Sequence, residues 1–393
     1  MKNHGKIAPG EIPPRSEERV HIHMQVDMVI IQSVPFCNLN CSYCYLPQRA
    51  VTRRISSDTL SQIFRQVFSS RFVSDEVTIL WHAGEPLILP VSFYEDAIEL
   101  QKKWNKRNVR VVNSLQTNAT LITQDWCDFF KTHAIKVGVS LDGPEHIHDA
   151  HRVDRTGRGS FHKAMQGVML LQENGLEYSI IAVVTKEALH EFESIWHFFE
   201  RLQPMRLGFN PEEREGINTH SSLQTEEEIE QYKTFLQSII ALSVRSHSPI
   251  IIREVESVLK HLIRGSFVTH SQTNTAMSIL SFDYNGNVST FSPELLNMTH
   301  PMYEDFTFGN VREMTVEDIL SAEKFIRINK QIQRGVALCR QTCSYFMFCG
   351  GGSPSNKLFE HGTFDATETM ACRLHVQAAV DVVIDHLEEV YDM

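Results

Sequence analysis

The sequence has no long apolar run and no apolar segment near its N-terminus. No stretch of the chain approaches the roughly 20 apolar residues that a membrane-spanning helix needs. Residues 1–22 are polar and contain several prolines, without the apolar core of a secretory signal. We therefore expect a cytoplasmic protein with no membrane partner, in which residues 1–22 form a mobile tail.

Positive charge is also in short supply. The 393 residues carry 37 Lys and Arg against 48 Asp and Glu, a formal net charge of −11. Nucleic-acid binding relies on basic surface, so we expect no nucleic-acid partner, although a local basic groove for an acidic peptide stays open. The length allows a large core and two domains.

Cysteine is scarce, and its eight copies are grouped. The groups are Cys37, Cys41 and Cys44, then Cys339, Cys343, Cys349 and Cys372, with Cys127 alone. Clustered cysteines without a secretion signal indicate metal ligation in a reducing compartment rather than disulfides. Cys127 lies on a predicted helix, where we expect a buried thiol that packs like a small apolar residue.

The first group lies in VPFCNLNCSYCY, residues 34–45, with the spacing Cys-x3-Cys-x2-Cys. Three thiolates on one loop can hold three corners of a four-iron cubane cluster and leave the fourth iron open. A structural zinc site normally takes four protein ligands, and a disulfide framework does not leave an odd number in one loop. A zinc loop or three unrelated buried thiols are the alternatives.

Apolar strands and amphipathic helices alternate from about residue 24 to residue 240. The predicted strands cover 25–32, 77–81, 109–114, 136–141, 178–184 and 206–209, and a helical pattern follows each of them. Such alternation indicates a parallel sheet. Six units are too few for a closed eight-fold barrel, so we expect an α/β fold. We predict a partial (β/α)6 TIM-like barrel over residues 23–245, with its active site at the C-terminal strand ends.

Three motifs follow the second, third and fourth predicted strands, where that site should lie. They are WHAGEPL at 81–87, SLQTNATLI at 114–122 and SLDGPEHIHDAHR at 140–152. They offer an acceptor, a hydroxyl and a cation, which a bound amino acid and ribose need close together. Taken singly, each motif has a plain structural explanation, such as a turn with an incidental glutamate or a surface pair of Arg152 with Asp149 or Asp154.

In this order, and together with the cysteine loop, the motifs resemble those of radical S-adenosylmethionine (SAM) enzymes, with Ala83 and Ala119 in place of two glycines. The resemblance implies that the loop cysteines hold a [4Fe–4S] cluster whose open iron chelates SAM. It implies SAM contacts from Tyr43, Gly84, Glu85, Thr117, Asn118, Ser140, Asp142 and Arg152. An electron from a reductant such as flavodoxin or ferredoxin would cleave SAM to a 5′-deoxyadenosyl radical, which takes a hydrogen atom from the substrate.

The segment GFNPEEREGIN, residues 208–218, follows the sixth predicted strand. We expect Asn210, Glu212 and Glu213 to face the substrate side of the barrel mouth. There they would bind a peptide or act as acid and base groups. A solvated acidic loop is the alternative.

Residues 246–393 form the second predicted domain, with bridging helices, a cysteine-rich part and a C-terminal helix. Its cysteines follow Cys-x3-Cys-x5-Cys, with Cys372 further on, and four thiolates can close a second cluster or a tetrahedral zinc site. The segment resembles the SPASM or twitch-like extension of radical SAM enzymes, which implies an auxiliary [4Fe–4S] cluster. Phe291 and Ser353 stand where a full SPASM domain has further cysteines, so we predict one auxiliary cluster that moves electrons.

Short segments around Asn210, Phe291 and Cys349 resemble the GRRM-type cyclophane-forming maturases of ribosomally made peptides. The resemblance implies a precursor-peptide partner and a C–C cross-link between an aromatic side chain and a β-carbon. Ser292 stands where sulfatase-maturing relatives have an Asp base, which argues against formylglycine formation. Epimerisation, with Cys127 as hydrogen donor, thioether formation, formylglycine-type oxidation and a non-catalytic metal-binding scaffold remain the alternatives.

Overall fold

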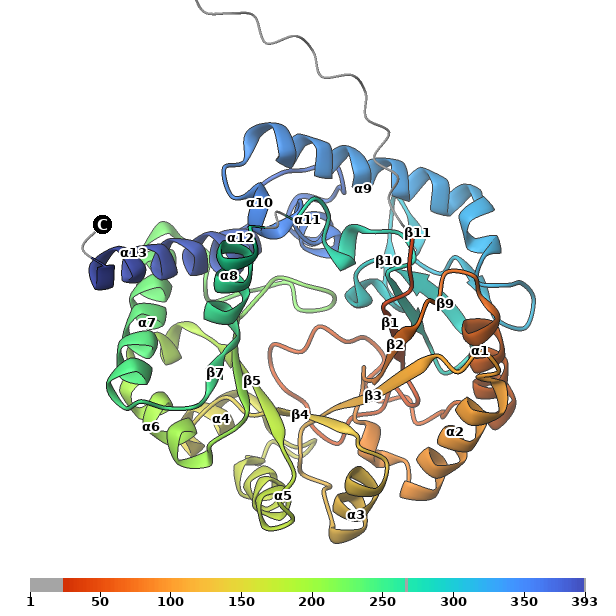
Figure 1. Cartoon of the computed structure of the whole chain (residues 1–393), viewed down its shortest axis with the longest axis horizontal. Coiled ribbons are helices and arrows are strands. Elements are labelled where there is room, and N and C mark those ends of the chain that lie inside the picture. The colour runs from red at the N-terminus through yellow and green to blue at the C-terminus, as the bar shows by residue number, and fades with distance from the viewer. Residues whose placement is uncertain (1–23, 266–267, 392–393) are drawn as a thin grey trace, which may run out of the picture.

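The computed structural model describes residues 24–265 and 268–391 (Figure 1). The tail predicted over residues 1–22 lies outside them. Within the described residues, no helix is long and apolar enough to cross a membrane.

One sheet of ten strands forms the centre of the molecule (Figure 1). Six strands lie side by side in chain order and pair in parallel: β1 (Met28–Ile31), β2 (Glu76–Trp81), β3 (Arg110–Thr117), β4 (Lys136–Ser140), β5 (Tyr178–Val184) and β6 (Arg206–Pro211). The prediction of an α/β fold with a parallel sheet is confirmed.

The sheet continues into the C-terminal part of the chain. At one end β7 (Ile251–Ile252) pairs in parallel with β6, and at the other end β8 (Ile279–Phe282) pairs in parallel with β1. The antiparallel strands β9 (Asn287–Thr290) and β12 (Gly309–Asn310) complete that end. A separate two-stranded sheet is formed by β10 (Thr299–His300) and β11 (Glu304–Asp305). Residues on both sides of position 245 therefore contribute to the sheet.

Helices cover the outside of the strand arc (Figure 1). They are α1 (Ser57–Ser69), α2 (Val91–Trp104), α3 (Gln124–Thr132), α4 (Glu145–His151), α5 (Phe161–Glu173), α6 (Phe192–Leu202) and α7 (Glu226–Arg245). In α1 the apolar positions recur at helical spacing, and Leu60, Ile63, Phe64 and Val67 are all buried.

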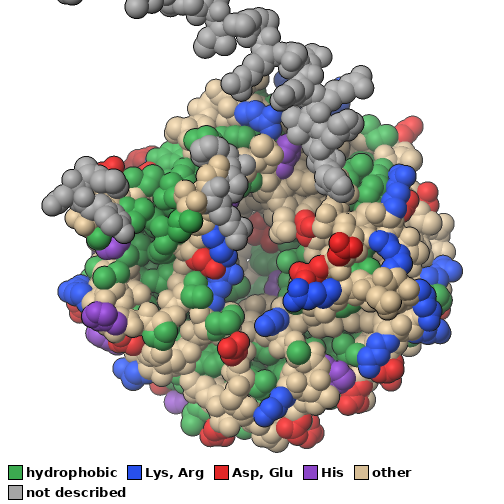
Figure 2. All heavy atoms as spheres, in the orientation of Figure 1, with side chains coloured by type: hydrophobic (Ala, Val, Ile, Leu, Met, Phe, Trp, Pro, Cys, Tyr) green, Lys and Arg blue, Asp and Glu red, His purple; other side chains and the backbone are tan. Residues whose placement is uncertain are grey.

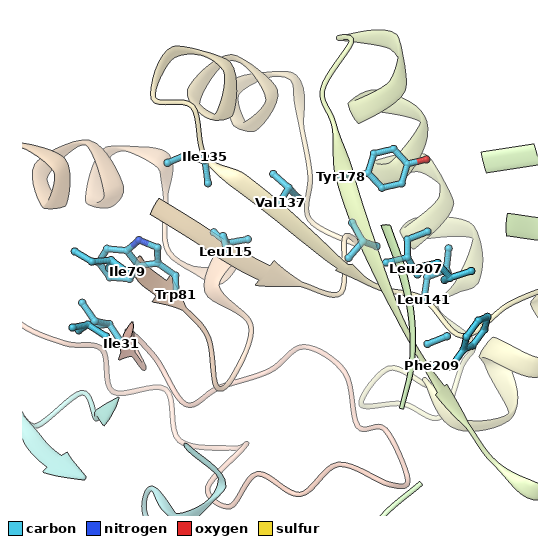
Figure 3. Close-up of a cluster of buried hydrophobic side chains, with 14 of the residues drawn as sticks. Ile31, Ile79, Trp81, Leu115, Ile135, Val137, Leu141, Tyr178, Leu207 and Phe209 are labelled. Atoms are coloured by element: carbon cyan, nitrogen blue, oxygen red, sulfur yellow. The ribbon is translucent and has the colours of Figure 1, made fainter. Parts of the chain in front are cut away.

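Along each strand, successive side chains point to opposite faces of the sheet, so one set packs in the core and the other faces the inside of the arc. In β5 the buried residues alternate with half-buried ones, and the half-buried Ile181 and Val183 line a cavity inside the arc. Figure 3 shows the buried layer, in which Ile79, Leu115 and Val137 come from successive strands. The same strands therefore build the core and the wall of the cavity.

The remaining helices are α8 (Arg253–Arg264), α9 (Glu323–Thr342), α10 (Phe346–Cys349), α11 (Pro354–His361), α12 (Met370–Cys372) and α13 (Ala379–Tyr391), with short 3-10 turns between elements. A π-helical stretch, Arg373–Ala378, joins α12 to α13. Buried apolar residues of the predicted C-terminal helix, among them Val380 and Val383, pack α13 against α7 and α8. In the view of Figure 1, α9, α10 and α11 lie together between α8, near one end of the strand arc, and β10 and β11, near the other.

Candidate active site

A cavity of about 590 Å³ opens at the C-terminal ends of the parallel strands. Its strand-end wall includes Glu85, Asn118, Ser140 and Asn210, which follow or end β2, β3, β4 and β6. The face seen in Figure 2 is hollowed near its centre. The strand-end motifs predicted to form one site are thus brought together in space.

Cys37, Cys41 and Cys44 line this cavity from the loop after β1. Hydrogen bonds hold the loop in place: Arg155 Nε donates to the Cys37 carbonyl at 2.8 Å, and Arg49 Nη1 donates to the Cys41 carbonyl at 3.1 Å. These contacts fix the backbone that aims the three thiols at the same space.

The chemistry of these thiols suits an iron–sulfur cluster. Burial, with the negative charges of Glu85 and the neighbouring thiols, raises the pKa of Cys37 to about 12. Burial also raises the pKa of Cys41 to about 11. Thiolates here need a metal-borne positive charge, and the Leu39 N–H already donates to Cys37 Sγ at 3.4 Å, as backbone amides do around cluster ligands.

All eight cysteines lie among the described residues, and none of them forms a disulfide. Among residues 24–265 and 268–391, no group of three or more His, Cys, Asp and Glu side chains is arranged to hold a single metal ion.

Glu85 is a buried carboxylate at the base of the cavity. Its Oε1 accepts hydrogen bonds from the Leu87 N–H at 3.0 Å and the Thr117 hydroxyl at 2.7 Å, and its Oε2 accepts one from the Asn118 N–H at 2.9 Å. Burial nevertheless raises its pKa to about 7. The ends of β2 and β3 therefore hold an acceptor that a bound ammonium group would stabilise.

The turn before Glu85 needs an unusual backbone. Ala83 has φ of +69° and Gly84 has φ of +116°. A Cβ at Gly84 would lie 2.2 Å from the Val34 carbonyl oxygen, so only glycine lets the turn approach the cysteine loop. Ala119, the other alanine in place of a family glycine, also has a positive φ, of +61°. Both positions keep the left-handed backbone despite the substitution.

Asp142 and Arg152 form a buried ion pair rather than the surface pairs considered from the sequence. Arg152 Nε donates to Asp142 Oδ2 at 2.9 Å and Nη2 donates to Oδ1 at 3.0 Å, while the Val183 N–H and the Tyr43 hydroxyl also donate to this carboxylate. Burial alone would raise the pKa of Asp142, but the Arg152 charge and these hydrogen bonds hold it below its usual value. Arg152 and Tyr43 line the cavity, and Asp142 positions them from behind.

The remaining predicted cofactor contacts also line the cavity: Gly84, Thr117, Asn118 and Ser140. Ser140 accepts a hydrogen bond from Gln116 Nε2 at 2.9 Å, which ties β4 to β3. The Asn118 side chain donates to Cys37 Sγ at 3.8 Å and to Asn38 Oδ1 at 3.0 Å. Asn118 therefore connects the third strand to the cysteine loop.

The end of β6 and the loop after it supply the predicted substrate-side residues, and all three line the cavity. The Asn210 Oδ1 atom is buried without a hydrogen-bond partner among the described residues. Glu212 is held by its neighbours, because its Oε2 accepts from the Ser222 N–H at 2.7 Å and the Ser222 hydroxyl at 2.6 Å. Glu213 pairs instead with His375, whose Nε2 lies 2.6 Å from Glu213 Oε1.

Glu215, Glu294 and His375 also line the cavity, although the sequence did not single them out as site residues. Burial and the charges of Glu294 and Glu213 raise the pKa of Glu215 well above its usual value. Burial raises the pKa of Glu294 to about 7, and the Glu213 charge adds to the shift. We call Glu213, Glu215 and Glu294 the acidic group.

The four C-terminal cysteines come from α9, its C-cap, α10 and α12. Cys349 and Cys372 line the cavity. Burial raises the pKa of Cys349, and the charges of Cys343 and Cys339 contribute. Backbone N–H groups point at two of these sulfurs, from Gly351 to Cys349 Sγ and from Thr369 to Cys372 Sγ, both at 3.4 Å.

Phe291 and Ser353, which stand where a full SPASM domain has cysteines, are held by ring packing and by hydrogen bonds. Phe291 is fully buried and stacks on Phe325 with the ring centroids 5.8 Å apart. The Ser353 hydroxyl lies 3.0 Å from the Ser292 hydroxyl and 2.9 Å from the Ser355 hydroxyl. Ser355 in turn donates to Glu215 Oε1 at 2.7 Å, so a serine chain positions the acidic group.

Cys127 is fully buried on α3, within the apolar core that surrounds it. Among the described residues it is not part of the cavity lining. An epimerase that uses Cys127 as its hydrogen donor is therefore disfavoured.

The family model described as the radical SAM superfamily matches residues 31–199, which hold the cysteine loop, Glu85, Asp142 and Arg152. An uncharacterized protein of Synechocystis sp. is 43% identical over 367 residues, which cover 92% of each chain. The chain belongs to the radical SAM superfamily. As a radical SAM oxidoreductase, it uses a [4Fe–4S] cluster and SAM.

Relatives of this radical SAM chain include the serine-type anaerobic sulfatase-maturating enzyme of Bacteroides thetaiotaomicron, which is 27% identical over 82% of this chain and 80% of its own. The solved structure of native anSMEcpe with bound AdoMet and Cp18Cys peptide has a TM-score of 0.77 and 23% identity, covering 93% and 98% of the two chains. Streptococcus suis SuiB bound to precursor peptide SuiA has a TM-score of 0.60 and 15% identity, covering 89% and 76%. The two solved structures establish the shared fold.

Proposed function

We propose that this radical SAM enzyme oxidises a side chain of a ribosomally made precursor peptide inside the central cavity. One observation carries the proposal: the loop cysteines, the acidic group and Cys349 with Cys372 all face the same cavity of about 590 Å³. The bound peptides of anSMEcpe and SuiB support a peptide substrate for this chain.

The chain's own residues suit the first cofactor site. Cys37, Cys41 and Cys44 would hold the [4Fe–4S] cluster, which together with SAM supplies the one-electron chemistry that removes a hydrogen atom from the substrate. Glu85 would accept hydrogen bonds from the SAM ammonium, because the ends of β2 and β3 already hold its carboxylate in place. Arg152, oriented by Asp142, would face the SAM carboxylate.

Cys339, Cys343, Cys349 and Cys372 would hold a second cluster, which would supply an acceptor for one electron. The N–H groups of Gly351 and Thr369 aimed at the sulfurs support this assignment, since such donors stabilise negatively charged cluster ligands. Four protein ligands leave no open iron for the substrate.

The product we propose is a C–C cross-link between an aromatic side chain and a β-carbon of the peptide. Forming it removes two hydrogens: one leaves as a hydrogen atom, and the other leaves as a proton and an electron. Glu213 is suited to take the proton, because His375 favours its ionised form.

The test is the mass of a short peptide encoded beside this gene, after anaerobic incubation with the reconstituted enzyme, SAM and a reductant in deuterated water. We expect loss of two hydrogens, no solvent deuterium on carbon, and a cyclic fragmentation pattern. An unchanged hydrogen count with one deuterium gained would mean epimerisation and would refute the oxidative proposal.

A formylglycine-type oxidation is the second candidate. Ser292 stands where sulfatase-maturing relatives have an Asp, but Glu294 lies two residues later and lines the cavity, and burial raises its pKa to about 7. The similarity to sulfatase-maturating enzymes favours the same reaction. An aldehyde product would react with a hydrazide reagent, whereas a cross-linked peptide would not.

A further inference from the structure

Lys357 is a buried lysine of the C-terminal part. It lies on α11 with only 3% of its surface exposed. Its Nζ donates a hydrogen bond to Cys339 Sγ at 3.4 Å. Within the described part of the chain, its ammonium forms no ion pair with a carboxylate.

A buried ammonium without a counter-ion is strongly destabilised by the loss of its hydration. A neutral thiol does not offset that cost, but a cluster held by four thiolates carries net negative charge in both of its oxidation states. We propose that Lys357 is the counter-ion of the auxiliary cluster and raises its reduction potential. The inference rests on the proposed second cluster and goes beyond it by assigning its potential to one side chain.

The neighbouring helix makes room for this lysine. Gly335 and Cys339 lie one turn apart on α9. A Cβ on Gly335 would lie 3.2 Å from Lys357 Nζ and 2.3 Å from the Phe364 carbonyl oxygen. The missing side chain therefore lets the ammonium reach Cys339 along the surface of α9.

The other cations near these cysteines are engaged elsewhere. Arg373 follows Cys372, but its guanidinium pairs with Glu226 and lies 3.9 Å from Glu368. Arg340 is solvent-exposed and stacks over the Phe346 ring at 5.2 Å. Among the residues that the structure describes, Lys357 is thus the buried cation that contacts a cysteine sulfur.

The effect on the cluster follows from electrostatics at low dielectric. The reduced cluster carries one more negative charge than the oxidised cluster, so a nearby ammonium stabilises the reduced form more. The couple is a one-electron step in which no bond forms or breaks and no proton is required. A higher potential makes the site a better acceptor for the electron left after substrate oxidation.

The test isolates the auxiliary cluster in a variant with Cys37→Ala, Cys41→Ala and Cys44→Ala. After anaerobic reconstitution, iron and sulfide are measured and the midpoint potential is followed by electron paramagnetic resonance. In this background Lys357→Met should lower the potential, while Lys357→Arg should keep it close to the parent value. Lys330→Met, an exposed lysine on α9, is the matched control and should leave it unchanged.

Each outcome decides a different point. An equal potential in Lys357→Met and the parent, with full iron content, overturns the role of Lys357 and leaves the cluster standing. Iron retained in Lys357→Arg but lost in Lys357→Met supports a charge requirement for assembly. Equal iron loss in both variants overturns the inference in favour of a packing role. An iron-free parent background refutes the auxiliary cluster itself.

Discussion

His375 Nε2 lies 2.6 Å from Glu213 Oε1, and this contact joins the π-helical stretch after Cys372 to the loop after β6. The imidazole and the carboxylate both line the central cavity. Asn356 Nδ2 also donates to Glu213, to Oε2 at 3.3 Å. The helical stretch that follows Cys372 therefore influences the charge of a carboxylate in the loop after β6.

Replacing His375 should change the pH dependence of product formation. Burial alone would raise the pKa of Glu213, but the charge and hydrogen bond of His375 hold it below its usual value. In His375→Gln the pKa of Glu213 should rise. On acidification, Glu213 then becomes protonated at a higher pH than in the parent. We expect the acidic limb of the pH–rate profile to move to higher pH. SAM cleavage without peptide is the control readout, and an unmoved limb would remove Glu213 from the role of proton acceptor.

Substitutions in the two cysteine groups should have different effects on SAM cleavage and on peptide modification. Cys41→Ala removes one of three ligands to the SAM cluster, and we expect SAM cleavage to fall to background, measured as 5′-deoxyadenosine under anaerobic, reducing conditions. Cys349→Ala should keep a substantial part of that cleavage and lose nearly all modified peptide. Retained cleavage in Cys41→Ala would contradict the cluster assignment, and equal losses of both products in Cys349→Ala would contradict the electron-acceptor role.

Breaking the buried pair of Asp142 and Arg152 should destabilise the chain strongly. Asp142→Asn leaves the guanidinium buried without a charged partner, and breaking such a pair costs about 3–5 kcal/mol. Urea unfolding of the chain should show a loss of this size. Asp149→Asn, which removes a charge from a carboxylate that caps α5 through the Ser160 and Phe161 N–H groups, is a comparison variant and should cost less. Equal losses would mean that the charge pair adds nothing beyond its hydrogen bonds.

Much of the strand-end wall could be predicted from the sequence because each part is local. The alternation of Tyr178–Val184 marks β5 at its observed bounds, and a strand end fixes where its following motif must lie. The acidic group is different, because Glu215 and Glu294 come from the loop after β6 and the turn after β9. No local sequence pattern predicts that Glu215 and Glu294 lie close together, because their proximity depends on how β8 and β9 extend the sheet beside β1.

The role of Asp142 shows the same limit at shorter range. Motif position suggests a SAM contact, yet the structure engages its carboxylate with Arg152, Tyr43 and the Val183 N–H. The short helix α4 separates Asp142 from Arg152 in sequence and brings them together in space. Sequence spacing selected Asp142 and Arg152 together, but only side-chain geometry shows that Arg152 lines the cavity while Asp142 supports it from behind.

Glu85 should contribute mainly to SAM binding. Glu85→Gln keeps the size of the side chain but puts an amide donor against the Thr117 hydroxyl or the Asn118 N–H, which now donate to the carboxylate. A lost charge-assisted hydrogen bond to an ammonium is worth about 1.5–3 kcal/mol, so we expect SAM affinity to fall at least tenfold. Equilibrium binding of SAM to the reconstituted enzyme without reductant measures this, with iron content as the control. Unchanged affinity at full iron content would remove Glu85 from the SAM site.

Glu294 should make the chain less stable as pH rises through the neutral range. Burial, together with the Glu213 charge, raises its pKa from 4.5 to about 7, so the folded state holds this proton more tightly than the unfolded state does. The free energy of unfolding therefore falls as pH rises between these two values, by at most on the order of 3 kcal/mol. Glu294→Gln cannot ionise, so it should gain stability relative to the parent at pH 8 and little at pH 4. Urea midpoints at the two pH values measure the difference, and Glu95→Gln, an exposed glutamate on α2, is the matched control. A gain of equal size at both pH values would mean that packing, and not the ionisation of Glu294, separates the variant from the parent.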